Sequence, residues 1–205
     1  MTTEPKPEEI VDLSGPQGET IFRHPLAYII ADHGPQLQSE LDEMWTHYKD
    51  ISDERLLALV AALCIENAVQ GLLESFSSGF AELREDSGCT FSLKIKMARA
   101  LRLVPARIFA SCDLIRQIRN EFAHHLHKKE LSQLDENKYL QKLAAHVAAF
   151  NPAERDKDLH AEMFKQLVSF VIIALRTYTH HVLRLREYLD TMTFQENLKR
   201  RAETK

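Results

Sequence analysis

The sequence predicts an all-α protein, a helical bundle of about five to six helices. Only 6 glycines and 7 prolines occur in 205 residues, too few for the many tight turns of an all-β protein. Apolar residues instead recur at spacings of three and four over several long segments, as in amphipathic helices. We therefore expect one helical domain over residues 25–195, preceded by a flexible arm at residues 1–24 that carries several prolines and glycines, and followed by a charged tail at residues 196–205.

The first two helices are expected at residues 35–48 and from Ser52 to about Leu83. Ser52 is the predicted N-cap of the second helix, and Asp53 and Glu54 lie in its first turn, where acidic side chains favour the helix dipole. Apolar residues of this helix keep spacings of three and four, and we expect them to form much of the core. They are Leu56, Leu59, Val60, Leu63, Cys64, Ala68, Leu72, Leu73 and Phe76.

Four further helices are expected at residues 92–103, 106–124, 136–150 and 156–191. Val104-Pro105 ends the first of them, because the residue before a proline is pushed out of the α region. The helix at 106–124 has an apolar packing face made of Ile108, Leu114, Ile115, Ile118 and Phe122. The last helix has an apolar band, with Met163 and Leu167 near its start and Leu185 and Tyr188 near its end. The band is wide enough either for the core alone or for the core and a partner chain, and we expect a homodimer.

Composition and charge exclude several classes of protein. With 30 acidic and 26 basic residues the net charge is −4, so the whole molecule lacks the charge of a tight nucleic-acid binder. Three cysteines without metal-ligand spacing predict buried thiols in a reducing compartment. The apolar stretch at residues 167–175 is much shorter than the roughly 20 residues that cross a bilayer, and the N-terminus lacks the pattern of a signal peptide. We therefore expect a cytoplasmic protein with no membrane contact.

The segment Arg119-Asn-Glu-Phe-Ala-His124 combines an anion-binding group with a proton-transfer group. Histidine exchanges protons near pH 7, and arginine offers two parallel hydrogen bonds to phosphate oxygens, so Arg119, Asn120 and His124 are candidate catalytic residues for metal-free RNA cleavage. Arg119 and His124 point about 140° apart on a regular helix. They would act together if the helix unwinds near His124, or if two copies meet across a twofold axis. Candidate RNA-binding residues flank them: Arg116, His125, His127, Lys128 and Lys129.

This segment resembles the arginine–histidine signature of the HEPN superfamily of helical domains, in many of which the arginine and the histidine are catalytic for RNA cleavage. A longer stretch, from Phe91-Ser-Leu-Lys-Ile-Lys-Met-Ala through Ala100-Leu-Arg-Leu-Val to the segment itself, is similar to the mannitol operon repressor family. The first resemblance implies a dimeric ribonuclease or RNA-binding regulator. The second implies a non-enzymatic transcriptional regulator. Because no helix-turn-helix with a basic recognition helix is apparent, such a regulator would act through a protein partner.

Other interpretations of the same residues are structural or metal-binding. Arg119 and Asn120 could brace neighbouring helices while His124 ends one. Glu121 and His124 have the Glu-x-x-His spacing of di-iron bundles, but the chain has no second copy of it, so we expect no metal and no cofactor. Ser111-Cys112-Asp113 has no base beside it in sequence and no nucleophile-elbow glycines, which argues against a serine nucleophile there.

Overall fold

The computed structural model describes residues 50–84, 86, 88–150 and 160–203, together with Ser39 and Thr46. The expected arm at residues 1–24 and nearly all of the helix expected at residues 35–48 lie outside these residues. The described part is all-helical, as the sequence predicted. Its elements are α2 (Glu54–Phe76), the 3₁₀ helix η1 (Ser78–Arg84), α3 (Phe91–Ala100), α4 (Ala106–His124), the 3₁₀ helix η2 (Leu131–Gln133), the π-helical turn η3 (Glu136–Leu140), α5 (Gln141–Phe150) and α6 (His160–Glu203).

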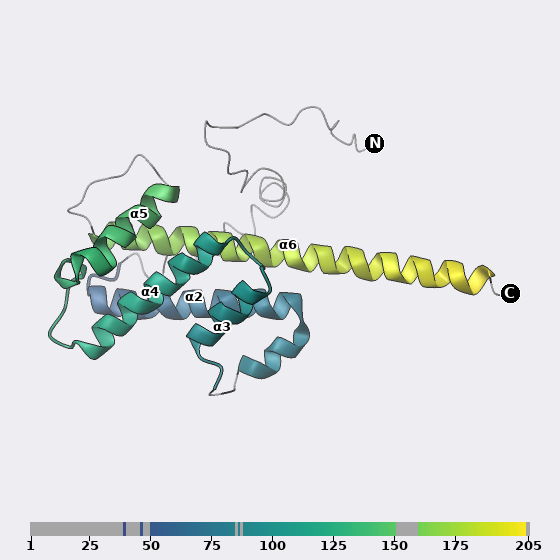
Figure 1. Cartoon of the computed structure of the whole chain (residues 1–205), viewed down its shortest axis with the longest axis horizontal. Coiled ribbons are helices and arrows are strands. Elements are labelled where there is room, and N and C mark those ends of the chain that lie inside the picture. The colour runs from purple at the N-terminus through teal and green to yellow at the C-terminus, as the bar shows by residue number, and fades with distance from the viewer. Residues whose placement is uncertain are drawn as a thin grey trace, which may run out of the picture.

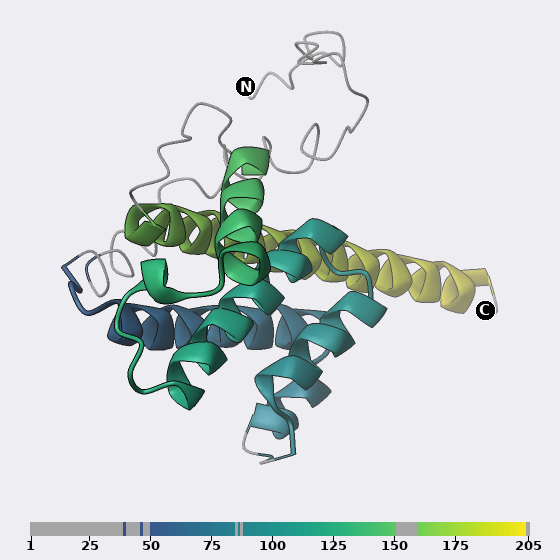
Figure 2. The ribbon, with the colours of Figure 1, turned by 60° about the vertical axis from the view of Figure 1, so that its left-hand side comes forward.

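Helix α2 lies at the centre of the bundle. It runs alongside α6 and is crossed on another side by α3 and α4, while α5 packs on α6 (Figure 1). Figure 2 shows the same arrangement from a second direction, with α4 lying across α2. The core between these helices contains large, fully buried side chains from four of them: Leu57, Ile65, Phe109, Ile118, Leu143 and Phe164.

The N-cap of α2 is Asp53, one residue after the predicted Ser52. The backbone of Asp53 is extended, and its carboxylate accepts hydrogen bonds from the backbone N–H groups of Arg55 at 2.9 Å and Leu56 at 3.1 Å. These bonds satisfy two donors that the first helical turn otherwise leaves without partners. The helix ends at Phe76, before the predicted Leu83, and the chain continues as η1.

The predicted core stripe of α2 is wrong in its first half and at its last residue, Phe76, which is 46% exposed. Leu56, Leu59 and Leu63 are 48%, 41% and 50% exposed. The buried face is the opposite one, which carries Leu57, Ala61 and Ile65 and continues to Ala68, Leu72 and Leu73, as predicted for these last three. The exposed leucines keep the same helical spacing on the other side. Both faces are apolar, so spacing alone did not identify the buried one.

Helix α4 has the predicted bounds, and its five predicted packing residues, Ile108 to Phe122, are all buried. Helix α3 begins after Thr90, whose hydroxyl accepts a hydrogen bond from the N–H of Leu93 at 3.3 Å. It ends at Ala100, three residues before the predicted end, because Arg102 turns the chain with a positive φ of 53°. The turn and Pro105 change the direction of the chain before α4 begins.

The last two helices also follow the prediction, with differences at their ends. The segment predicted as a helix at 136–150 begins with the π-helical turn η3 and continues as α5. Helix α6 is 44 residues long, about 66 Å at 1.5 Å per residue, and it continues to Glu203 through residues expected to form a separate tail. Its C-terminal half projects from the bundle (Figure 1), so Leu185 and Tyr188, which the sequence placed in the apolar band, are exposed.

One described helix has the length and composition of a membrane span. Helix α2 is long and apolar enough to cross a bilayer, but 56% of its most apolar window is buried inside the bundle. The central helix of a globular core has the same length and composition, so this match is weak evidence for a membrane span. A cytoplasmic location stays a prediction.

Candidate functional site

The last two turns of α4 carry the candidate catalytic residues. The helix is regular and ends at His124, and the N–H of its C-cap, His125, donates to the carbonyl of Glu121 at 3.0 Å. Unwinding near His124, one of the two arrangements that would bring it to Arg119, is therefore not present. Arg119 and His124 are both exposed and point away from each other around the helix. Within one chain they do not face a common substrate position.

Arg119 and Asn120 lie side by side at a surface depression of about 340 Å³ between α2, α3 and α4. The guanidinium Nη1 of Arg119 donates to the amide Oδ1 of Asn120 at 2.9 Å. On the opposite wall Glu66 accepts a hydrogen bond from Lys94 Nζ at 2.8 Å, which offsets its charge. The depression thus presents a guanidinium and an amide to solvent, two groups that bind phosphate oxygens.

Glu121 holds the end of α4 to the following loop. Its carboxylate accepts hydrogen bonds from Lys128 Nζ at 2.7 Å and the Tyr139 hydroxyl at 2.9 Å, and His125 Nε2 lies 3.4 Å away. The hydrogen bond from Lys128, followed by that from Tyr139, lowers the pKa of Glu121. Both carboxylate oxygens are occupied, so Glu121 has a structural role and is not placed as a metal ligand with His124. Among the described residues, no three or more histidine, cysteine, aspartate or glutamate side chains are grouped so that they could hold a metal ion.

The loop at residues 125–130 is also tied to the start of α2. Arg55 Nη1 donates to the carbonyl of Leu126 at 3.2 Å, and Glu54 accepts a hydrogen bond from the N–H of Leu131 at the end of the loop. The rings of His125 and His127 meet edge to face, with their centroids 5.8 Å apart. These contacts fix the loop beside His124 and place its histidines on the surface.

The predicted RNA-binding residues divide into paired and exposed ones. Arg116 forms an ion pair with Asp113 at 2.8 Å, and Lys128 is paired with Glu121. The charges of these two residues are therefore offset by carboxylates of the protein. His125, which is exposed, also lies near Glu121, at 3.4 Å. His127 and Lys129 are exposed and remain better placed to meet a phosphate.

An apolar patch adjoins the depression. We call the exposed side chains Leu56, Leu59 and Leu63 of α2 the leucine patch. Leu63 is also part of the wall that faces Arg119 and Asn120. Leu126, in the loop tied to Arg55, is 67% exposed near the first turn of the same helix. Contiguous apolar side chains on a protein surface often mark a contact with another protein.

Sequence reasoning missed a serine–histidine contact. His146 on α5 lies 35 residues from Ser111, and its Nδ1 is 2.7 Å from the Ser111 hydroxyl oxygen. A base therefore reaches Ser111 from a distant part of the chain, although none lies beside it in sequence. Ser111 is fully buried and its hydroxyl also donates to the Arg107 carbonyl at 3.1 Å, while Asp113 binds Arg116 and Gln117 instead. The pair joins α4 to α5 and does not present a nucleophile to solvent.

Three comparisons, with protein-family models, with curated proteins and with solved structures, found no match for this chain. Its candidate function therefore rests on the geometry of the α4 end and its surroundings.

Proposed function

We propose that this protein is a HEPN-like, dimeric, metal-independent endoribonuclease or RNA-binding protein whose site is formed by Arg119, Asn120 and His124. The observation that supports this most is the exposure of the guanidinium and the imidazole at one helix end, with the partly buried amide of Asn120 beside the guanidinium. Arg119 and His124 are exposed, whereas the neighbouring Glu121 and Phe122 are taken up by structural contacts. The side chains proposed to bind phosphate and transfer protons thus differ from those that fix the helix end to the rest of the protein.

Each residue has a chemical task in this proposal. His124 takes a proton from the attacking 2′-hydroxyl or gives one to the leaving 5′-oxygen, since imidazole titrates near neutral pH. Arg119 stabilises the negative charge that builds on the phosphate in the transition state. Asn120, already hydrogen-bonded to Arg119, orients the guanidinium and the phosphate. His125, His127 and Lys129 contact neighbouring phosphates.

A second copy of the chain completes the site. Because α4 is regular through His124, Arg119 and His124 of one chain diverge, and a twofold axis beside this helix end would bring Arg119 of one copy toward His124 of the other. The leucine patch supports this position for the interface, since it borders the depression and would lose its exposure to water in the dimer. The Arg119 side of α4 would then lie at the rim of the interface.

The proposal is tested by incubating wild type and His124→Ala protein with RNA in the presence of a chelator. A matched control is His181→Ala, which removes a histidine from α6, far along the chain from the site. We expect cleavage by wild type and by His181→Ala, and a loss of at least about 100-fold for His124→Ala, the usual scale of a lost acid or base. Circular dichroism must show equal helix content and equal melting temperature for the three proteins. Equal cleavage by wild type and His124→Ala would refute the assignment.

A second candidate is a non-enzymatic regulator, similar to the mannitol operon repressor family, that binds a protein partner. The leucine patch favours it, since an exposed apolar surface fits a protein as well as a second copy of the chain. In this case wild type protein would not cleave RNA, and substitutions in the leucine patch would abolish partner binding while His124→Ala would leave it unchanged. The cleavage assay thus separates the two candidates.

A further inference from the structure

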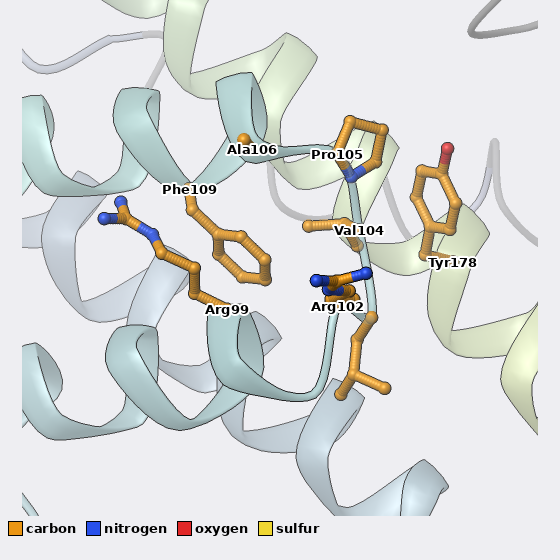
Figure 3. A pocket seen from close by; sticks show the side chains of 8 residues that line it. Arg99, Arg102, Val104, Pro105, Ala106, Phe109 and Tyr178 are labelled. Carbon is orange, nitrogen blue, oxygen red and sulfur yellow. The ribbon is translucent and has the colours of Figure 1, made fainter.

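A second cavity lies on a different part of the molecule, where the turn between α3 and α4 meets α6. Its volume is about 570 Å³, within the range of small-molecule sites. Figure 3 shows its lining: Phe109 from α4 and Tyr178 from α6 provide aromatic rings, and Val104 and Pro105 provide aliphatic surface. Phe109 is fully buried, so its ring is a fixed part of the wall. Such a cavity can hold a flat apolar group.

The charged residues that line this cavity are both positive. Arg99 comes from the last turn of α3 and Arg102 from the turn itself, and no carboxylate is among the lining residues. Neither guanidinium has a hydrogen bond or ion pair within the described part of the chain. In Figure 3 the Phe109 ring lies between the Arg99 and Arg102 side chains. A ligand with an anionic group on an apolar body would therefore meet positive charge and apolar surface in the same cavity.

One further group favours an anion at this place. Burial raises the pKa of Tyr178, with the nearby charge of Arg107 acting in the opposite direction. The Tyr178 hydroxyl consequently stays protonated and able to donate.

Arg102 occupies a backbone position that does not suit an arginine. Its N–H donates to the carbonyl of Arg99 at 3.0 Å and the next N–H, of Leu103, donates to Ala98 at 3.3 Å, which is the hydrogen-bond pattern of a Schellman motif. The residue with positive φ in this motif is usually glycine, because a Cβ is disfavoured there. Arg102 has a φ of 53°. A glycine at this position would end the helix without strain, so the turn does not explain why the residue is an arginine.

We propose that the cavity formed by Arg99, Arg102, Phe109 and Tyr178 is a binding site for a small organic anion, a phosphate or carboxylate attached to an aromatic or other flat apolar body. The arginines bind the anionic group, and Tyr178, Val104 and Pro105 contact the body. This site is separate from Arg119, Asn120 and His124, and its occupancy does not depend on RNA cleavage.

The test uses phenyl phosphate as the probe, with inorganic phosphate and phenol as its two halves, in calorimetric titrations of the full chain. We expect phenyl phosphate to bind at least about tenfold more tightly than either half, since only it uses both parts of the cavity. Benzoate in place of phenyl phosphate shows whether the anionic group is a phosphate or a carboxylate. Equal affinity for phenyl phosphate and inorganic phosphate would overturn the proposed cavity chemistry.

Substitutions of Arg102 separate binding from folding. Arg102→Gly removes the charge and relieves the backbone, so it should weaken phenyl phosphate binding by about tenfold or more while raising Tm by about 1–4 °C. Arg102→Ala should lose phenyl phosphate binding without the rise in Tm. Arg102→Lys should keep part of the binding. Unchanged affinity in Arg102→Gly would overturn the proposal. Arg84→Gln, which removes an exposed arginine on η1 outside both sites, should bind phenyl phosphate like wild type, and a loss equal to that of Arg102→Gly would overturn the assignment to this cavity.

Discussion

Replacement of Glu121 by glutamine tests the division of the Arg119–His124 segment into structural and exposed residues. The Glu121 side chain is 15% exposed, and its carboxylate holds Lys128 and the buried Tyr139. Glutamine keeps the shape and one acceptor oxygen, but it loses the charge and turns an NH₂ group toward one of the two donors. A hydrogen bond to a charged group contributes about 1.5–3 kcal/mol. We therefore expect Glu121→Gln to lower the free energy of unfolding by about 2–3 kcal/mol.

The assay is thermal unfolding followed by circular dichroism, at neutral and at acid pH. A loss of this size lowers Tm by about 4–12 °C for a domain of this length. Because the pKa of folded Glu121 is depressed below its ordinary value of 4.5, its contribution to stability is fully present above about pH 4.5 and is lost as the pH falls through the folded pKa. Wild type and Glu121→Gln should consequently become more alike in stability under strongly acidic conditions.

The matched control is Glu162→Gln, which removes a surface pair with Lys165 at 3.2 Å. The Glu162 side chain is 52% exposed, and exposed pairs contribute little, so this variant should melt within about 2 °C of wild type. The reasoning is refuted if Glu121→Gln melts like wild type at neutral pH. If it also lost RNA cleavage, Glu121 would belong to the reacting centre and not to the scaffold.

Three further predictions concern the interface, the α4–α5 contact and the core. Leu63→Glu should change Tm by little because the side chain is half exposed. Light scattering should nevertheless show that it converts a dimer to a monomer, and an unchanged mass would exclude the leucine patch as the interface. Burial, followed by the charge of Lys142, lowers the pKa of His146. The unfolded chain therefore binds more protons than the folded one, and stability should fall as the pH drops below about 6.5. In urea titrations, His146→Gln should reduce this dependence of stability on pH. Ile118→Ala should cost about 2–5 kcal/mol in urea unfolding, and a loss below about 1 kcal/mol would contradict its fully buried position.

The parts of the fold that follow from local signals could be predicted from the sequence. Helix α4 has the predicted bounds because Pro105 starts it and a run of polar residues follows it, and its buried face follows from one clear apolar stripe. Helix α2 is apolar on two faces, so its spacing was compatible with either being buried. Only the packing of α6 on α2, a contact between distant parts of the chain, and the contacts of α3 and α4 decide between them.

The candidate site shows the same limit. The sequence identified Arg119, Asn120 and His124 as residues able to carry chemistry, and it placed them at a helix end. It did not reveal that Lys128 and Arg116 pair with carboxylates, since Glu121 and Asp113 are only two of several acidic residues within reach. The contact of Ser111 with His146 and the positive φ of Arg102 also depend on tertiary packing, for which the sequence carries no local signal.

The proposal that two chains share one site is tested most directly by mixing two inactive variants. Arg119→Ala and His124→Ala proteins are co-expressed, so that half of the dimers contain one copy of each, and cleavage of RNA is measured in the presence of a chelator. If Arg119 of one chain acts with His124 of the other, each mixed dimer has one intact site, and the mixture should recover about a quarter of wild type activity. No recovery, with mixed dimers shown to form, would contradict a site shared between two chains.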